Sequence, residues 1–146
     1  MDTIAHILKE KGTTIHRASG DVTVLAAVEM MSGKRIGALM VCEEGQPIGI
    51  FSERDLMTRV ILAGRDPATT RVEEVMSRDV VFVEPSTSAE EAMAVMTERR
   101  CRHLPVVSGG SVVGLISIGD LVRWESRDQA FHIRMLTDYI QGKYPG

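Results

Sequence analysis

The stretch "GIFSERDLM" (Gly49–Met57) returns sixty-five positions later as "GLISIGDLV" (Gly114–Val122), with Gly, Ser, Asp and Leu in the same places. Sliding the chain against itself at this offset gives a gap-free register that pairs residues 14–57 with residues 79–122. Self-similarity at a fixed period indicates a duplicated structural unit. The chain therefore contains one folding pattern written twice.

Each copy predicts an amphipathic helix, because apolar residues recur at i, i+3, i+4 and i+7. The stripes consist of Val24, Ala27, Val28 and Met31 in the first copy and of Ala89, Ala92, Met93 and Met96 in the second. Thr23 and Ser88 precede these stripes as N-caps. Two β-type runs then flank a glycine-containing turn, "EEGQ" or "SGGS", which is typical of a β-hairpin.

A second helix is expected to start at Ser52 and at Ser117. A further strand is predicted ahead of each first helix, at residues 13–18 and 79–84. Each copy is thus β-α-β-β-α, and neither is large enough to bury its own helix and sheet faces well. We therefore expect an α/β (α+β) fold in which the two repeats pack sheet to sheet as a pseudo-twofold pair.

The duplication divides the chain into predicted segments. The first repeat spans residues 8–62 and the second spans residues 79–125. Residues 63–78 contain Gly, Pro and a short helical "VEEVM" run and are interpreted as the linker. An N-terminal helix is expected near residues 3–11, and residues 126–146 are predicted to form a C-terminal helix and tail.

The composition is that of a soluble globular protein. The 146 residues carry 17 Lys and Arg against 20 Asp and Glu, and the basic residues are scattered, which argues against nucleic-acid binding. No apolar run reaches the roughly 18 residues of a membrane-spanning helix, and the N-terminus has no signal-peptide pattern. We expect a cytoplasmic protein that binds neither membrane nor nucleic acid. Cys42 and Cys101 are interpreted as reduced thiols, with a redox sensor or a disulfide as the alternative.

The sequence resembles a known family. The doubled motif, the "RHLPVV" strand (residues 102–107) and the "VEEVMSRDVVFV" lead-in (residues 72–83) are similar to the paired cystathionine β-synthase (CBS) domain module, also called a Bateman module. The resemblance covers about residues 8–125 and implies two quasi-equivalent nucleotide clefts between the repeats. It also implies a homodimer in which two modules pair through their helices.

The Ser-x-x-Asp motif at each helix start is open to two interpretations. It is a capping box, in which Ser accepts a hydrogen bond from an amide one turn ahead and Asp returns one to the cap amide. It is also suited to a nucleotide, because a helix N-terminus attracts phosphate and a nearby carboxylate can accept both hydroxyls of a ribose. Both interpretations apply to Ser52 with Asp55 and to Ser117 with Asp120.

The resemblance assigns the ribose to the Asp, the ribose or phosphate to the Ser, and the adenine to the start of the other repeat and to the residue after the motif Gly. One predicted site contains Ile50, Ser52, Arg54, Asp55, Asp79 and Val80. The other contains Thr14, Ile15, Leu115, Ser117 and Asp120.

The two predicted sites differ in basic residues. Arg54 in the first copy is replaced by Gly119 in the second. The resemblance also implies a phosphate-binding role for Arg102 or His103, ahead of the motif Pro. We therefore expect the Asp55 site to be the stronger anion site. The alternatives are a solvated surface charge at Arg102 and a satisfied, half-buried histidine at His103.

The leading hypothesis is a regulatory sensor of adenine nucleotides that acts through ligand-dependent packing and an unknown effector protein. AMP is favoured as the ligand, with ATP, ADP or NAD(H) as further candidates, and no metal is required. The runner-up is a protein-interaction or scaffold module with vestigial nucleotide sites. The chain contains no GxSxG, P-loop or HExxH motif, so we predict that it is not an enzyme.

Overall fold

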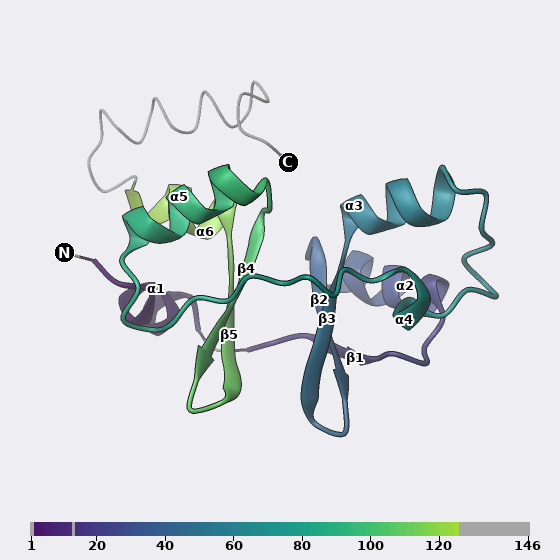
Figure 1. The fold of residues 1–146 in the computed structure, drawn as a ribbon, viewed down its shortest axis with the longest axis horizontal. Coiled ribbons are helices and arrows are strands. Elements are labelled where there is room, and N and C mark those ends of the chain that lie inside the picture. The colour runs from purple at the N-terminus through teal and green to yellow at the C-terminus, as the bar shows by residue number, and fades with distance from the viewer. Residues whose placement is uncertain (1, 13, 126–146) are drawn as a thin grey trace. The chain divides into compact units, whose positions relative to one another are not determined.

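The computed structural model describes residues 2–12 and 14–125 and divides into two compact units (Figure 1). Unit 2 is the segment Ile15–Val80, and unit 1 combines the N-terminal segment up to Thr14 with the chain from Val81 onward. Unit 1 therefore contains the second repeat together with the N-terminal segment, including residues 8–14, which were predicted as part of the first repeat. The expected sheet-to-sheet pairing of the two repeats stays a prediction, as does the C-terminal helix, which lies outside the described residues.

Unit 2 is built on a three-stranded sheet. β1 (Arg17–Ser19) runs parallel to β2 (Ala38–Glu43), and β2 pairs antiparallel with β3 (Gln46–Ser52). The parallel pair is joined by the helix α2 (Val24–Lys34), as a parallel connection requires. The β-α-β-β order predicted for the first repeat is confirmed, although β1 is shorter than the predicted strand at residues 13–18.

Three further helical segments complete unit 2. α3 (Glu53–Asp55) follows β3 directly and continues as the π-helix η1 (Leu56–Ile61). α4 (Val72–Val75) is the short helix predicted within the linker, and it packs on β3. The second helix of the first repeat thus changes from α to π geometry one turn after its start.

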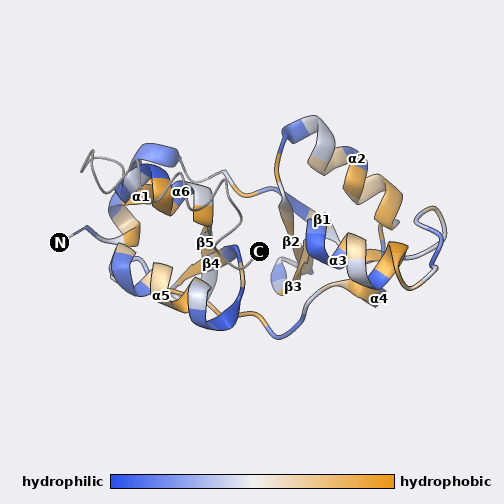
Figure 2. Cartoon of the chain, turned by 90° about the horizontal axis from the view of Figure 1, so that it is seen from above, coloured by the Kyte–Doolittle hydropathy of each residue, from blue (hydrophilic) through white to orange (hydrophobic). Residues whose placement is uncertain are grey.

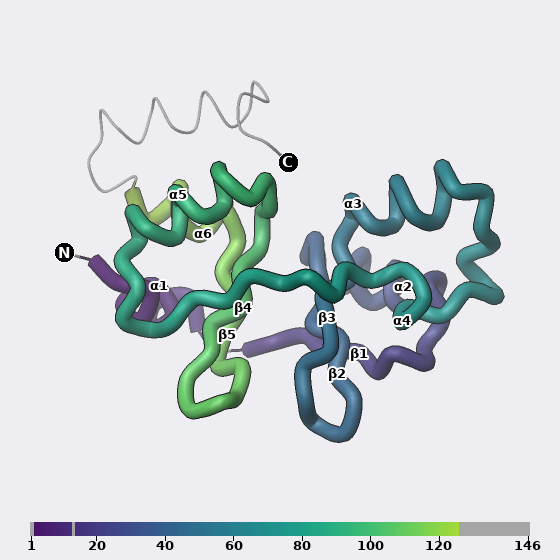
Figure 3. Tube along the Cα trace, viewed as in Figure 1, coloured from purple at the N-terminus to yellow at the C-terminus, as the bar shows by residue number. Residues whose placement is uncertain are grey.

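Unit 1 contains the second hairpin, β4 (His103–Ser108) with β5 (Ser111–Ser117). Three helices pack against it: α1 (Ile4–Lys11), α5 (Ala89–Arg99) and α6 (Ile118–Glu125). In the Cα trace of Figure 3, α1 in purple lies beside β5 and α6 in green, from which it is separated by most of the chain.

The strand predicted at residues 79–84 forms only in part. Val83 makes one isolated parallel bridge to Val106, in the place where Ala18 of β1 pairs with Val41. The residues that flank Val83 are half-buried or exposed and carry no further ladder. The first strand of the second repeat is therefore reduced to a single bridge.

The helix N-caps predicted from the sequence are present. The Thr23 side chain accepts a hydrogen bond from the Ala26 amide at 3.1 Å. The Ser88 side chain accepts one from the Glu91 amide at 3.0 Å. Figure 2 shows hydrophobic residues along most of α2, whereas α5 carries more hydrophilic ones.

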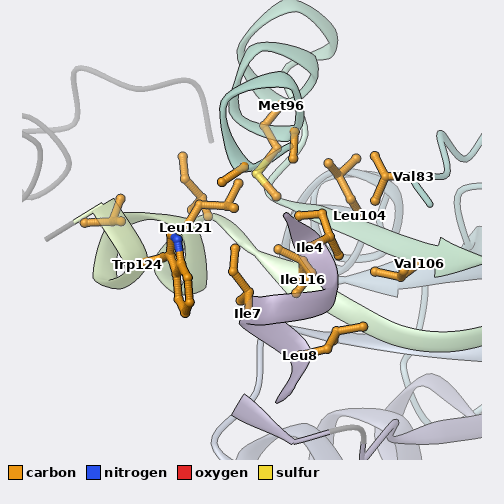
Figure 4. Close-up of a cluster of buried hydrophobic side chains, with 14 residues drawn as sticks. Ile4, Ile7, Leu8, Val83, Met96, Leu104, Val106, Ile116, Leu121 and Trp124 are labelled. Atoms are coloured by element: carbon orange, nitrogen blue, oxygen red, sulfur yellow. The ribbon is translucent and has the colours of Figure 1, made fainter. Parts of the chain in front are cut away.

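Each unit has its own hydrophobic core, into which the predicted helical stripes point. Unit 1 buries the apolar face of α1 against the hairpin, α5 and α6 (Figure 4). The labelled side chains in that view are Ile4, Ile7, Leu8, Val83, Met96, Leu104, Val106, Ile116, Leu121 and Trp124. Val24, Ala27 and Met31 of α2 are buried in the separate core of unit 2.

The N-terminal helix takes the same place in unit 1 that α4 takes in unit 2. The amide of Ile4 donates to the carbonyl of Thr87 at 2.9 Å, and the amide of Val72 donates to the carbonyl of Val22 at 2.9 Å. Thr87 and Val22 are equivalent positions of the two repeats. Each repeat is thus completed by a helix that precedes the other repeat in the sequence.

Candidate functional site

The Ser-x-x-Asp motif of the first repeat stands at the junction of β3 and α3. The Ser52 amide donates to Asp55 Oδ2 at 3.0 Å, and the Asp55 amide donates to Ser52 Oγ at 3.3 Å. This reciprocal pair is the capping box predicted from the sequence. Asp55 is nevertheless buried, with 4% of its surface exposed. Burial of the carboxylate is not part of the capping-box geometry itself.

Two further groups contact the Asp55 carboxylate. The hydroxyl of Ser77 donates to Asp55 Oδ1 at 2.8 Å. Arg59, one turn along the helix, places its Nε 3.7 Å from the same oxygen and donates through Nη1 to the carbonyl of Met76 at 2.9 Å. The carboxylate is therefore held mainly by neutral hydroxyl and amide donors, with one cation at longer range.

The second repeat forms the same capping box at the junction of β5 and α6. The Ser117 amide donates to Asp120 Oδ2 at 2.8 Å, and the Asp120 amide donates to Ser117 Oγ at 3.1 Å. Asp120 is buried as well, with 6% of its surface exposed. The two motifs thus form the same local structure and bury their carboxylates to the same degree.

The other partners of Asp120 are two cations. Lys11 Nζ, at the end of α1, lies 2.6 Å from Asp120 Oδ2 and also donates to the carbonyl of Leu115 at 2.5 Å. Arg123 donates through Nη2 to Asp120 Oδ1 at 2.5 Å. The local charge around Asp120 is therefore more positive than that around Asp55.

Opposing influences act on the acidity of Asp120. Burial alone would raise the pKa of this carboxyl, because the charged form loses hydration. The hydrogen bonds from Lys11 and from the Ser117 amide, together with the charge of Lys11, outweigh burial and lower the pKa below its ordinary value. Asp120 is therefore ionised at neutral pH.

His103 lies at the start of β4, opposite Ser117 of β5. Burial lowers the pKa of its imidazole to about 4, and the positive charges of Lys11 and Arg102 act in the same direction against the raising effect of Asp120. The ring is therefore neutral at physiological pH and offers a hydrogen-bonding nitrogen but no charge. A neutral ring can contact a phosphate only as a hydrogen-bond donor, and the phosphate-binding role of His103 and its half-buried alternative both stay predictions.

The first predicted site lies within one unit. Ile50 and Ser77 form an antiparallel bridge, with amide-to-carbonyl distances of 3.0 and 2.8 Å. This bridge places the segment that leads on to Asp79 and Val80 beside the strand that carries Ile50. Ser52 and Asp55 lie at the end of that strand, and Arg54 is exposed on α3. How these residues would share a ligand stays a prediction.

The second predicted site is divided between the two units. Leu115, Ser117 and Asp120 belong to unit 1, as does Thr14, whereas Ile15 begins unit 2. The predicted cooperation of Arg54 with Arg102 or His103 also joins residues of different units. Both combinations therefore remain predictions.

Four residues that touch the two carboxylates were not singled out from the sequence. Arg59 and Arg123 follow their Asp at helical spacing, so an i, i+3 or i, i+4 search would have found them. Ser77 and Lys11 come from segments outside the aligned repeat that fold back on it. No local pattern in the sequence reports such a contact.

Within the described residues, no group of three His, Cys, Asp or Glu side chains is arranged to hold a metal ion. Cys42 and Cys101 are both free and half-buried, and burial raises the pKa of the Cys101 thiol. None of the helices in the described part of the chain is long and apolar enough to cross a membrane.

Comparisons with known proteins agree with this architecture. The CBS domain family model matches residues 13–62 and 72–127. A mitochondrial CBS domain-containing protein of Arabidopsis thaliana is 34% identical over 151 residues, which cover 97% of this chain and 73% of that protein. The solved structure of a CBS-domain protein of Burkholderia ambifaria is 48% identical, with a TM-score of 0.84 over 87% of this chain and 96% of the other.

A more distant structure shares the fold alone. It is a CBS domain pair in complex with 5′-methylthioadenosine and S-adenosyl-L-methionine, 20% identical, with a TM-score of 0.73 over 84% of this chain and 98% of the other. Each matched segment contains one of the two aligned repeats, the second beginning at residue 72 within the predicted linker, and together they span more than half of the sequence. The chain belongs to the CBS domain family and contains a tandem pair of CBS domains.

Proposed function

We propose that this chain is a regulatory module that senses an adenine nucleotide. The observation that carries the proposal is the burial of a carboxylate at both motif positions, with 4% of Asp55 and 6% of Asp120 exposed. Burying an ionised group costs free energy, and capping alone does not require it. Charged groups held in this way are frequent at functional sites. A carboxylate beside a helix start suits the two hydroxyls of a ribose.

The ligand class follows from this chemistry and from the family. A related CBS pair binds two adenosine-containing molecules, which supports an adenosine moiety in the ligand here. AMP is the favoured ligand, with ADP, ATP or NAD(H) as further candidates. The ligand acts by binding two packing arrangements of the module with different affinity, and an effector protein detects the change. The module is cytoplasmic and has no catalytic activity of its own.

Exposed apolar side chains support the proposed homodimer. Met57, Ile61 and Leu62, along η1 and just after it, are 55%, 58% and 76% exposed, and Leu25 of α2 is 43% exposed. Exposed apolar patches commonly mark an association surface. We propose that a second copy of the chain covers these side chains.

One observation favours the runner-up, a scaffold whose nucleotide sites are vestigial. Both carboxylates already accept hydrogen bonds from side chains of this chain, Ser77 at Asp55 and Lys11 at Asp120. A vestigial site would keep such bonds permanently, whereas a working site would exchange them for ligand hydroxyls. Ligand binding therefore separates the two functions.

Thermal unfolding with AMP, ADP, ATP, NAD and NADH tests the proposal. A ligand at a hundredfold excess over its Kd should stabilise the fold by about 2.7 kcal/mol. We expect Asp55→Ala to weaken binding more than Asp120→Ala, whereas Asp21→Ala, at an exposed aspartate, should leave it unchanged. The sensor function is wrong if no nucleotide changes the melting temperature. Mass spectrometry of small molecules that co-purify with the folded protein would identify the physiological ligand.

A further inference from the structure

Lys11 connects α1 to the candidate nucleotide site of the second repeat. Its ammonium lies 2.6 Å from Asp120 Oδ2 and 2.5 Å from the carbonyl oxygen of Leu115. These are the carboxylate proposed for the ribose and the backbone of the residue proposed for adenine. We propose that Lys11 is an internal competitor, which must release Asp120 before a nucleoside can bind there. This inference rests on the nucleotide-binding function proposed above.

The acceptor capacity of Asp120 explains why Lys11 and a ribose compete. A carboxylate offers about four lone-pair positions. The Ser117 amide and Lys11 occupy Oδ2, and Arg123 occupies Oδ1. A ribose that donates two hydroxyls needs two positions, so one of the two cations has to leave.

Lys11 is the cation that a ligand displaces. Arg123 shares α6 with Asp120 and lies one turn along it, at i, i+3 spacing. Lys11 reaches Asp120 from the last residue of a different helix and also occupies the Leu115 carbonyl on β5. The Lys11 side chain is 34% exposed and that of Arg123 is 69% exposed, so either cation can turn into water. Within the described residues, only Lys11 also covers the Leu115 carbonyl, so its release frees both groups for the nucleoside.

The first repeat provides the contrast. There, the group that comes from outside the motif is the neutral hydroxyl of Ser77, 2.8 Å from Asp55 Oδ1. Both bonds have a carboxylate as acceptor, but the bond from Lys11 to Asp120 adds the attraction between two opposite charges. A ligand at Asp55 therefore displaces a weaker partner than a ligand at Asp120 does.

Displacement of Lys11 also selects between ligands. An uncharged nucleoside that binds at Asp120 gives the released ammonium no new partner. A ligand with a phosphate offers that ammonium an anion nearby. Lys11 therefore disfavours adenosine relative to AMP, and it makes the end of α1 responsive to occupancy of the site.

Calorimetric titration of the full chain with adenosine and with AMP tests this role. Lys11→Met should bind adenosine about tenfold more tightly than the wild type, which corresponds to the loss of one charge-assisted hydrogen bond. AMP affinity should stay the same or fall. Lys9→Met is the matched control, because Lys9 is an exposed lysine on the same helix. The gain should disappear in Lys11→Met/Asp120→Asn, which assigns it to Asp120.

The outcomes separate this inference from the proposed function. Equal adenosine affinity in Lys11→Met and the wild type overturns the competitor role and leaves nucleotide binding intact. Failure of every protein to bind either ligand overturns both. If Lys11→Met does not fold, amine acylation of the wild type, read by mass spectrometry, replaces it. Saturating adenosine should speed acylation of Lys11 relative to Lys9, and an unchanged ratio overturns the inference.

Discussion

The two repeats fold the same motif but surround it differently. Ser52 with Asp55 and Ser117 with Asp120 form matching capping boxes at equivalent positions. The third partner is a serine hydroxyl at Asp55 and a lysine ammonium at Asp120. The bonds within the motif are the same in both repeats. The two sites differ chemically in the side chains that reach them from outside the aligned repeat, Ser77 and Lys11.

The same contrast applies to the glycine that opens each motif. At Gly49, an added Cβ would lie 2.7 Å from the backbone oxygen of Ser77. At Gly114, it would lie 2.6 Å from Leu8 Cδ2, at the end of a flexible side chain. The motif needs a glycine in both repeats because a flanking segment crosses close to the strand. The neighbouring atom belongs to the backbone of Ser77 at Gly49 and to the flexible side chain of Leu8 at Gly114.

The largest expected effect on stability comes from replacing these two glycines by alanine. Gly49→Ala should destabilise the fold by about 3 kcal/mol, because the Ser77 backbone must shift to make room. Gly114→Ala should cost about 1 kcal/mol, since Leu8 can change rotamer within the core. Urea unfolding of the two variants measures the difference. A larger cost for Gly114→Ala would show that α1 is held more rigidly than the Ser77 segment.

A second difference lies at His103, whose equivalent in the first repeat is Ala38. Burial lowers the pKa of His103 to about 4, against about 6.5 when unfolded. Between these values the unfolded chain binds a proton that the folded chain does not, so stability falls as the pH falls. The loss should reach about 2 kcal/mol at pH 5.

His103→Ala removes this titration and makes the second repeat resemble the first at that position. Urea unfolding of the variant between pH 7 and pH 5 should give a flatter dependence of stability on pH than the wild type shows. The comparison uses the slope, so a cavity left by the missing ring does not affect it. Equal slopes would mean that His103 is hydrated and charged in the folded protein.

The sequence predicted those parts of the fold that depend on local patterns. The helical stripe from Val24 to Met31, the N-caps Thr23 and Ser88 and the glycine turns need no distant contact. The missing strand around Val83 could not be predicted in this way. The residues around Val83 have the same β-type pattern as those of the strands that form. Whether such a run forms a strand depends on its pairing with a neighbouring strand, and here only Val83 pairs, with Val106.

The sequence predicted the residues of the candidate site that belong to the Ser-x-x-Asp motif, but not the partners that other segments contribute. Asp55, Asp120 and their serine caps follow from a four-residue pattern. Lys11 lies more than a hundred residues from Asp120 in the sequence, on a helix whose packing partner the sequence does not indicate. Sequence comparison of the repeats ranked Asp55 as the stronger anion site from Arg54, and the cations around Asp120 compete with a ribose at the other site. Titration of the two aspartate variants tests this ranking.

The two aspartates should also differ in stability. Asp120→Asn leaves Lys11 and Arg123 without their shared counter-ion and should cost about 2 kcal/mol at pH 7, less than a fully buried pair because both cations reach solvent. Asp55→Asn loses mainly hydrogen bonds with neutral donors and should cost about 1 kcal/mol. Urea unfolding at pH 7 compares them.

Acid titration provides the control for the Asp120 variant. The folded pKa of Asp120 is lowered, so its contribution to stability is present above about pH 4, where the unfolded carboxyl is ionised, and is lost as the pH falls through the lower folded value. The gap between the wild type and Asp120→Asn should therefore shrink at acid pH. A gap that stayed constant would assign the cost to altered packing instead of charge.

The smallest expected effect concerns the turns of the two hairpins. Glu44 and Gly45 have φ values of 51° and 79°, and Gly109 and Gly110 have values of 61° and 78°. Positive φ at both central positions fits the type I′ turn, for which Asn-Gly is preferred, and a glutamate is strained there. Glu44→Asn should therefore stabilise the fold by about 0.5–1 kcal/mol, whereas Gly109→Glu should destabilise it by a similar amount.

Glu43→Asn, before the turn, controls for the lost charge. Both hairpins have their register shift at equivalent positions, Val41/Cys42 and Val106/Val107. If Glu44→Asn stabilises the fold and Gly109→Glu destabilises it, the difference in stability therefore comes from the turn residue itself.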